Sequence, residues 1–196
     1  MVGNTEYRIP NTEYRTPNTD SMSSYPYFIS TLPSLAFGEV PPMSSRDFIE
    51  NSREWISDAD WKALKVAVSG GENQIKNPAG IQWRNWEETL QNALAAARAA
   101  KLGKDQTPYL NKAGIADSLM KSAVQEAIKA ENQQKAEEIL DKLKWSFLDE
   151  LSAAHYFDFN VALCYLLQLK ILERWAALDE ETGKETLNKS IEKQEK

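Results

Sequence analysis

The chain has 196 residues, a length that suits a single domain. Hydrophobic residues make up 42% and charged residues 27%, a balance that is typical of globular proteins and excludes an intrinsically disordered chain. The net charge is −6, so the basic excess that nucleic-acid binding requires is missing and we expect no nucleic-acid partner. A single cysteine excludes a disulfide framework and a multi-cysteine metal site, and it indicates a reducing compartment.

A short tandem repeat occupies residues 1–21, which we assign as a disordered tail, separate from a single helical domain over residues 22–196. The sequence Asn-Thr-Glu-Tyr-Arg-Ile-Pro of residues 4–10 recurs with one change at residues 11–17. Each copy ends in proline, which a helix interior does not tolerate, and no apolar stripe is available for burial. Two interpretations stay open: a recognition tail, or a tandem DNA repeat translated upstream of a true start at Met22.

Residues 23–43 are rich in proline and aromatic side chains, so a long helix is excluded there. We predict an extended strap that lies over the helices and includes a short strand at Tyr27–Ser30. The apolar side chains of this segment are too numerous to stay in water, which places them against the helical core. They are Tyr27, Phe28, Ile29, Leu32, Leu35 and Phe37.

After the strap, apolar residues follow helical spacing almost to the end of the chain. Ser44 or Ser45 is expected to cap a first helix. A second helix should begin at residues 57–60 and end at the pair Gly70 and Gly71.

The next two helices are predicted on either side of Gly103. A polar loop over residues 72–80 leads to a helix from about Trp83 to Leu102, which the glycine terminates. The pair Thr107 and Pro108 is typical of a helix start. The helix that follows should reach about Ala130, with an apolar face made by Leu110, Ile115, Leu119, Ala123 and Ala127.

Two long helices are predicted near the C-terminus, over about residues 133–156 and 159–178. Because so few residues join them, they should form an antiparallel hairpin. A last amphipathic segment, Lys184 to about Gln194, should fray. The fold class is therefore all-α: a helical bundle with a long antiparallel C-terminal hairpin and an aromatic, proline-rich N-terminal strap. Trp145, Phe147, Leu163, Leu166, Leu167 and Trp175 should be buried where the hairpin meets the helix of residues 83–102.

The most apolar stretch, residues 159–178, is interrupted by Gln168, Lys170, Glu173 and Arg174. A membrane-spanning helix needs about 20 mostly apolar residues, and central charges are strongly disfavoured. We therefore interpret the stretch as a buried core helix and expect no direct membrane insertion. The N-terminus also lacks the basic start and apolar core of a signal peptide.

His155 and Cys164, the single residues of their kinds, invite comparison with a nucleophilic dyad. Cys164 lies in an apolar run, however, where burial should raise the pKa of the thiol and hide it. His155 is better explained as a last-turn residue that complements the helix dipole, and Asp158 as an N-cap.

A di-metal bundle site is also excluded, because it needs Glu-x-x-His pairs on two helices and the chain has one histidine. Phosphate-binding glycine motifs and the nucleophile elbow are missing as well. We assign no catalytic, cofactor-binding or metal-ligating residue, expect no cofactor, and classify the chain as a non-enzyme. The helical carboxylates Asp141, Asp149, Glu150 and Glu173 should pair with Lys144, Arg98 or Arg174, or face water.

Several stretches together carry a resemblance to a known family. They are Tyr-Pro-Tyr-Phe-Ile-Ser-Thr-Leu-Pro-Ser-Leu at residues 25–35, Ala-Ala-Ala-Arg-Ala-Ala-Lys-Leu-Gly-Lys-Asp at residues 95–105, and the hairpin from residues 140–150 through 155–158 to 170–175. From about Ser24 onward the chain resembles a bacterial family of uncharacterised proteins encoded among the genes of bacterial V/A-type ATPases. Such genes stand where a gene is expected for the funnel-shaped adapter between the membrane rotor ring and the central shaft. The resemblance implies a shortened protein similar to that adapter, an assembly factor or a peripheral component of the complex.

The sequence therefore supports two alternative hypotheses about function. The first is a non-enzymatic subunit or assembly factor of a V/A-type rotary ATPase, partnered by central-stalk or rotor-ring subunits. Its location would be cytoplasmic, peripheral on the inner face of the plasma membrane. The alternative is a stand-alone helical domain that binds a small molecule or acts as an enzyme. An enclosed pocket with converging polar groups would favour the alternative, whereas a continuous exposed apolar or charged band would favour the first.

Overall fold

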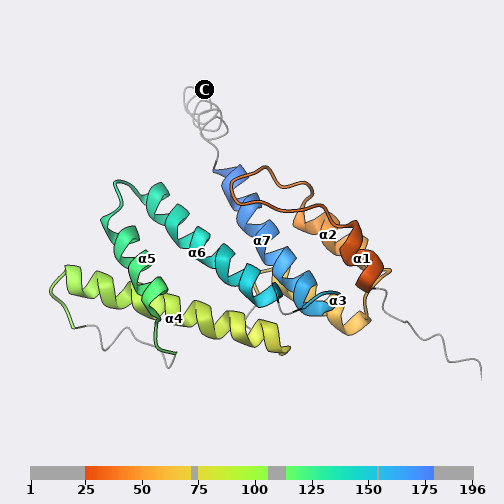
Figure 1. Cartoon of the computed structure of the whole chain (residues 1–196), viewed down its shortest axis with the longest axis horizontal. Helices are drawn as coiled ribbons and strands as arrows, with labels where there is room; N and C mark the ends of the chain where they lie inside the picture. The colour runs from red at the N-terminus through yellow and green to blue at the C-terminus, as the bar shows by residue number, and fades with distance from the viewer. Residues whose placement is uncertain (1–24, 72–74, 106–113, 154, 179–196) are drawn as a thin grey trace, which may run out of the picture.

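The computed structural model describes residues 25–71, 75–105, 114–153 and 155–178 (Figure 1). The predicted all-α class is confirmed for these residues, which form helices and no strand. The predictions for residues 1–21, for Thr107 and Pro108, and for residues 184–194 lie outside the described residues. The helices are α1 (Tyr25–Thr31), α2 (Ser45–Ser52), α3 (Asp58–Val68), α4 (Pro78–Lys101), α5 (Ser118–Lys129), α6 (Gln133–Ala153) and α7 (Phe159–Ala177).

Helix α7 is the centre of the fold, because it packs against α1, α2, α3, α4 and α6. Figure 1 shows it between α6 on one side and α1 and α2 on the other. Its side chains are buried around most of its circumference, as expected for a helix enclosed by neighbours. Fully buried examples are Leu163, Leu166 and Leu169.

Helices α6 and α7 are antiparallel neighbours joined by residues 154–158. Gln168 Nε2 donates to Asp149 Oδ1 at 2.6 Å near the connection. Nearer the far ends of both helices, Trp175 Nε1 donates to Asp141 Oδ2 at 2.9 Å. Helix α5 covers the other side of α6 and also packs on α4, which closes a second, smaller apolar cluster.

Side-chain caps fix where the helices begin. Ser44 accepts from the backbone N–H of Asp47 and the Asp47 side chain accepts from that of Ser44, so the predicted cap of α2 is confirmed as a capping box. Ser57 caps α3, which begins within the predicted range of residues 57–60, and Asp158 caps α7 as the sequence predicts. Each cap supplies an acceptor to first-turn N–H groups that have no partner within the helix.

The predicted strand at Tyr27–Ser30 is wrong, because these residues belong to helix α1. Pro26 is tolerated there since it lies in the first turn, where the missing N–H would have had no intrahelical partner. Helical spacing brings Tyr25 and Phe28 to one buried face, and the Phe28 ring contacts that of Phe48, with centroids 5.5 Å apart. Residues 32–44 then form almost no regular structure, and the Tyr165 hydroxyl donates to the carbonyl of Pro33 at 3.0 Å.

Helix α4 begins earlier than predicted, at Pro78 rather than Trp83. The Asn-Pro pair, interpreted from the sequence as part of a loop, is a cap: the Asn77 side chain accepts from Gly80 N and proline occupies the first turn. The C-terminal end agrees with the prediction, since Gly103 follows the helix with a φ of 65°.

Helix α5 begins later than predicted. Residues 114–117 are not helical, and Asp117 caps a helix that starts at Ser118. Ile115 and Leu119, expected to be apolar-face residues, are 93% and 64% exposed. The Asp117 cap places Ile115 outside the helix, whereas Leu119 lies in the first turn of α5 and is nevertheless exposed.

The predicted hydrophobic core is confirmed for most of its members. Trp145, Leu163, Leu166 and Leu167 are buried. Phe147 and Trp175 are only half-buried, which corrects the prediction for those two residues. Phe147 stacks on Trp86 of α4 with ring centroids 4.5 Å apart, so α6 does meet α4 through aromatic contact.

Candidate functional site

Cys164 is buried inside α7 and its thiol is poorly suited to act as a nucleophile. Only 1% of the residue is exposed. Burial, together with the negative charges of Asp158 and Asp149, raises the pKa of the thiol to about 12. The thiolate is therefore scarce at neutral pH, as the sequence predicts.

His155 lies in the connection after α6 rather than in the last turn of a helix, which corrects the predicted dipole role. Its Nδ1 lies 2.6 Å from Asp158 Oδ2. The other carboxylate oxygen of Asp158 accepts from the backbone N–H groups of Asn160 and Val161, at 2.9 and 3.2 Å. The histidine is thus held by the residue that caps α7.

The same cluster connects the N-terminal ends of α4 and α7. Asn77 Nδ2 donates to Asn160 Oδ1 at 2.8 Å, while Asn77 Oδ1 accepts from Gly80 N at 2.9 Å. Asn160 Nδ2 in turn lies 3.1 Å from His155 Nδ1. These side chains all make helix-capping or helix-joining contacts, so the cluster has a sufficient structural explanation.

Asp141 is a fully buried carboxylate on α6, and the predicted pairing with Lys144 and Arg174 is confirmed. Lys144 Nζ lies 3.3 Å from Oδ1, and Arg174 contacts Oδ2. Trp175 Nε1 also donates to Oδ2. Because these partners come from both helices, the carboxylate ties α6 to α7 at the end away from their connection.

Two other helical carboxylates accept hydrogen bonds from neutral donors. Asp149 accepts from Gln168 Nε2, and Glu173 accepts from the backbone N–H of Ser45 at 2.6 Å. The second contact joins the start of α2 to α7 and was not foreseen. No sequence signal marks it, because the partners are far apart along the chain.

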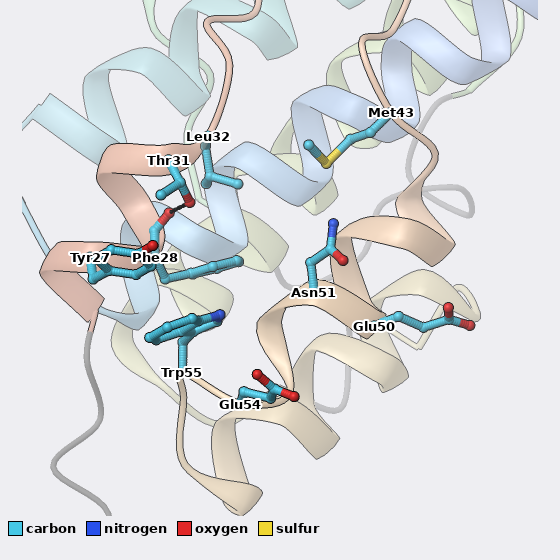
Figure 2. A pocket seen from close by; sticks show the side chains of 9 residues that line it. All are labelled: Tyr27, Phe28, Thr31, Leu32, Met43, Glu50, Asn51, Glu54 and Trp55. Carbon is cyan, nitrogen blue, oxygen red and sulfur yellow. Dashed lines mark hydrogen bonds between the residues drawn. The ribbon is translucent and has the colours of Figure 1, made fainter.

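A pocket of about 380 Å³ lies beside α1 and α2 (Figure 2). Phe28, Leu32 and Met43 supply its apolar lining. Tyr27 and Trp55 also line it, with ring centroids 4.4 Å apart. Figure 2 shows the rings of Tyr27, Phe28 and Trp55 on one side of the pocket, with Met43 and Asn51 opposite.

Glu50 and Glu54 line the same pocket, and Figure 2 shows the Glu54 carboxylate beside Trp55 and the Glu50 carboxylate directed away from the rings. Sequence reasoning gave no role to the two glutamates, which precede Trp55 in the chain. A signal was available, because the two glutamates lie just before that tryptophan in the chain. The pocket also needs α1, because Tyr27 and Phe28 of that helix complete its aromatic side.

A smaller pocket of about 210 Å³ lies among α4, α5 and α6. Trp86, Leu119 and Phe147 are among its lining residues. Across the described residues no group of three or more His, Cys, Asp or Glu side chains is arranged to hold a metal ion. None of the helices within the described ranges combines the length and apolar character needed to cross a membrane.

The described residues thus form helices, and their candidate reactive side chains contact other parts of the fold. His155 contacts the Asp158 cap of α7, and Asp141 joins α6 to α7. A protein-family model described as "Protein of unknown function (DUF2764)" matches residues 72–196. The match covers more than half of the chain, which therefore belongs to this family. Neither a curated protein nor a solved structure matches the chain significantly.

Proposed function

We propose that the protein is a non-enzymatic subunit or assembly factor of a bacterial V/A-type rotary ATPase. The specific role we propose is that of an adapter between the rotor ring and the central stalk. The sequence resemblance described above supports the ATPase connection. In this proposal the protein is cytoplasmic and lies peripherally on the inner face of the plasma membrane.

One observation supports a docking role over a catalytic one: the reactive side chains are engaged in internal contacts. His155 contacts the α7 cap, Asp141 joins α6 to α7, and Cys164 is buried. Exposed aromatic residues, in contrast, are available for contact with a partner. Tyr156 and Phe157, between α6 and α7, are 78% and 51% exposed.

The proposed adapter would be rigid enough to transmit force. We propose that α6 and α7 act as one long hairpin and that residues 32–44 act as a strap that holds α1 and α2 over α7. The Tyr165–Pro33 and Ser45–Glu173 hydrogen bonds support this arrangement, because each ties the N-terminal part of the chain to α7. Such long-range contacts resist separation of the helices.

The test is to isolate membranes that contain the natural complex, wash them at low and high salt, and identify co-purifying proteins by mass spectrometry. We expect ATPase subunits to accompany the protein at low salt. High salt should release it without detergent, because charged contacts between surfaces are screened. Deletion of the gene should impair assembly or ATP-driven ion pumping. Normal assembly and pumping in the deletion strain would overturn the proposal.

Two variants separate docking from catalysis. Cys164→Ser and His155→Gln should leave ATPase assembly intact, because Cys164 is buried and His155 contacts the residue that caps α7. Circular dichroism should first show that each variant retains its helices. A loss of pumping with assembly preserved would instead indicate a chemical role for the altered side chain.

A second candidate function is a stand-alone helical domain that binds a small molecule. The pocket beside α1 and α2 favours it, since aromatic rings and polar side chains meet there. In that case a purified protein without ATPase partners should retain a bound small molecule, which native mass spectrometry would detect.

A further inference from the structure

The pocket between α1 and α2 combines aromatic walls with negative charge. Tyr27 is 54% exposed, and its ring lies against that of Trp55 with centroids 4.4 Å apart. Phe28, 2% exposed, closes the inner end. An entering group would therefore meet aromatic rings on one side of the pocket, with Met43 and Asn51 on the other (Figure 2).

The charge of the lining has one sign. Glu50 and Glu54 are both exposed and both line the pocket, and the lining includes no lysine or arginine. The nearby Arg53 is paired with Asp58 and stacks on Trp61, so its charge is already engaged. The pocket is thus complementary to a cation.

The chemistry of the walls favours a guanidinium group over an ammonium. Arginine stacks its flat head on aromatic rings and can donate to carboxylates through several N–H groups at once. The protein uses this arrangement elsewhere: the Arg53 guanidinium lies 4.4 Å from the centroid of the Trp61 ring while Arg53 Nη1 pairs with Asp58. Met43, a flexible side chain, can adjust to the methylene stem of the guest.

We propose that this pocket receives an arginine side chain from a segment of a partner protein. The guanidinium would stack against Trp55 and Tyr27 and pair with Glu54, while Glu50 adds a second negative charge to the lining. That the partner is a component of the ATPase rests on the function proposed above, whereas the arginine-binding chemistry rests on the pocket alone.

The first experiment uses the full chain and a capped Ala-Arg-Ala peptide, with the capped Ala-citrulline-Ala peptide as a neutral control of nearly equal shape. Binding is followed by the NMR signal of the Trp55 indole N–H, assigned with the Trp55→Phe variant. We expect a saturable shift with the arginine peptide and affinity at least about tenfold lower with citrulline, because the charge-assisted contacts are lost. Equal affinity for the two peptides would overturn the proposal.

Matched charge variants locate the site. Glu50→Gln together with Glu54→Gln should weaken binding of the arginine peptide at least about tenfold. Glu126→Gln together with Glu131→Gln removes the same charge from exposed positions outside the pocket, and should leave the affinity within about twofold. An equal loss in both double variants would mean non-specific attraction and would overturn the proposal.

Two further arms identify the occupant. In the first, tetramethylammonium is used as a probe for a small organic cation. If it binds more tightly than the arginine peptide, the occupant is a free cation and the assignment to an arginine side chain is overturned. Peptide binding that emerges only after Arg8→Gln and Arg15→Gln would mean that the chain's own repeats occupy the pocket, which would overturn assignment to a partner.

Membrane co-purification of the Glu50→Gln, Glu54→Gln protein then separates this inference from the proposed function. Loss of ATPase subunits, with peptide binding also lost, supports both. If the natural protein binds the arginine peptide but no ATPase proteins accompany it in membrane preparations, the proposed function is overturned and the proposal of an arginine-binding pocket is supported. Normal ATPase association without peptide binding overturns the pocket proposal alone.

Discussion

Asp141 is the carboxylate that is fully buried among the described residues, and it lies where α6 and α7 contact each other. A buried charge is costly unless it is paired. Here Lys144 and Arg174 form ion pairs with the carboxylate, and Trp175 Nε1 donates a hydrogen bond to it. Because Trp175 and Arg174 are consecutive residues of α7, the contact also sets the register of α7 against α6. The carboxylate thus joins α6 and α7 at one defined register.

Asp141→Asn should lower the free energy of unfolding by about 1–3 kcal/mol, since it removes the charge from hydrogen bonds and ion pairs that the buried site depends on. The side chains of Arg174 and Lys144 are 42% and 19% exposed, so water can partly replace their lost partner and limit the cost. Urea unfolding followed by tryptophan fluorescence measures the change. Glu126→Gln, an exposed control, should stay within about 0.5 kcal/mol. Equal effects of the two substitutions would show that the Asp141 pairing contributes nothing.

Cys164 and Tyr165 give the protein a predicted sensitivity to alkaline pH. Burial raises the pKa of Cys164 to about 12 from its usual 9.0, and that of Tyr165 to about 12 from 10.0. At a pH between the unfolded and folded pKa values, the two groups have lost their protons in the unfolded chain but keep them in the folded one. The free energy of unfolding should therefore be at its full value below about pH 9 and should fall as the pH rises toward 12. Urea midpoints measured across this window test it, and Cys164→Ala should make the fall shallower. An unchanged slope in that variant would contradict the assignment to the thiol.

At the scale of the helices, local caps and tertiary burial act together. Ser44, Ser57 and Asp158 are short polar residues that precede apolar-periodic segments, and each begins a helix where the sequence predicts one. Helix propensity alone does not decide which faces are buried. Among the described residues, helix α7 is buried around most of its circumference because α1, α2, α3, α4 and α6 all pack on it, whereas the main contacts of α5 are with α4 and α6.

Leu166→Ala should lower the free energy of unfolding by about 2–5 kcal/mol, because Leu166 is 0% exposed in the central helix and its removal leaves a cavity. Leu119→Ala on α5 is the matched control, since the same atoms are removed from a residue that is 64% exposed. That substitution should cost less than about 1 kcal/mol. Urea unfolding of both variants under one set of conditions makes the comparison. Similar costs would mean that the packing around α7 is not what stabilises the chain.

At the scale of the whole molecule, α7 lies between the N-terminal and the middle parts of the chain. It contacts α1, α2 and α3 on one side and α4 and α6 on others. The larger apolar cluster therefore contains residues from Tyr25 to Leu172. Such long-range connection favours unfolding in one cooperative step.

A chain that begins at Met22 should unfold at the same temperature as the full chain, within about one degree. The reason is that the repeat of residues 1–21 lacks an apolar stripe to bury, while the apolar cluster begins at Tyr25. Differential scanning calorimetry of the two proteins makes the comparison. A decrease of several degrees in the shortened chain would mean that the repeat contributes to the folded structure.

The sequence by itself determined the helical class, the helix starts after residues 44–45 and at residues 57–60, the cap at Asp158, and the burial of Cys164. These features depend on neighbours a few residues away, and apolar periodicity or a short polar side chain reports them directly. Only the tertiary structure decided that Tyr27–Ser30 is helical, that Leu119 faces water, and that Asp141 is buried. The pocket is likewise tertiary, since α1 and residues 50–55, which are distant in the chain, both line it. Local spacing specifies which face of a helix is apolar, but which faces meet depends on packing between segments far apart in the chain.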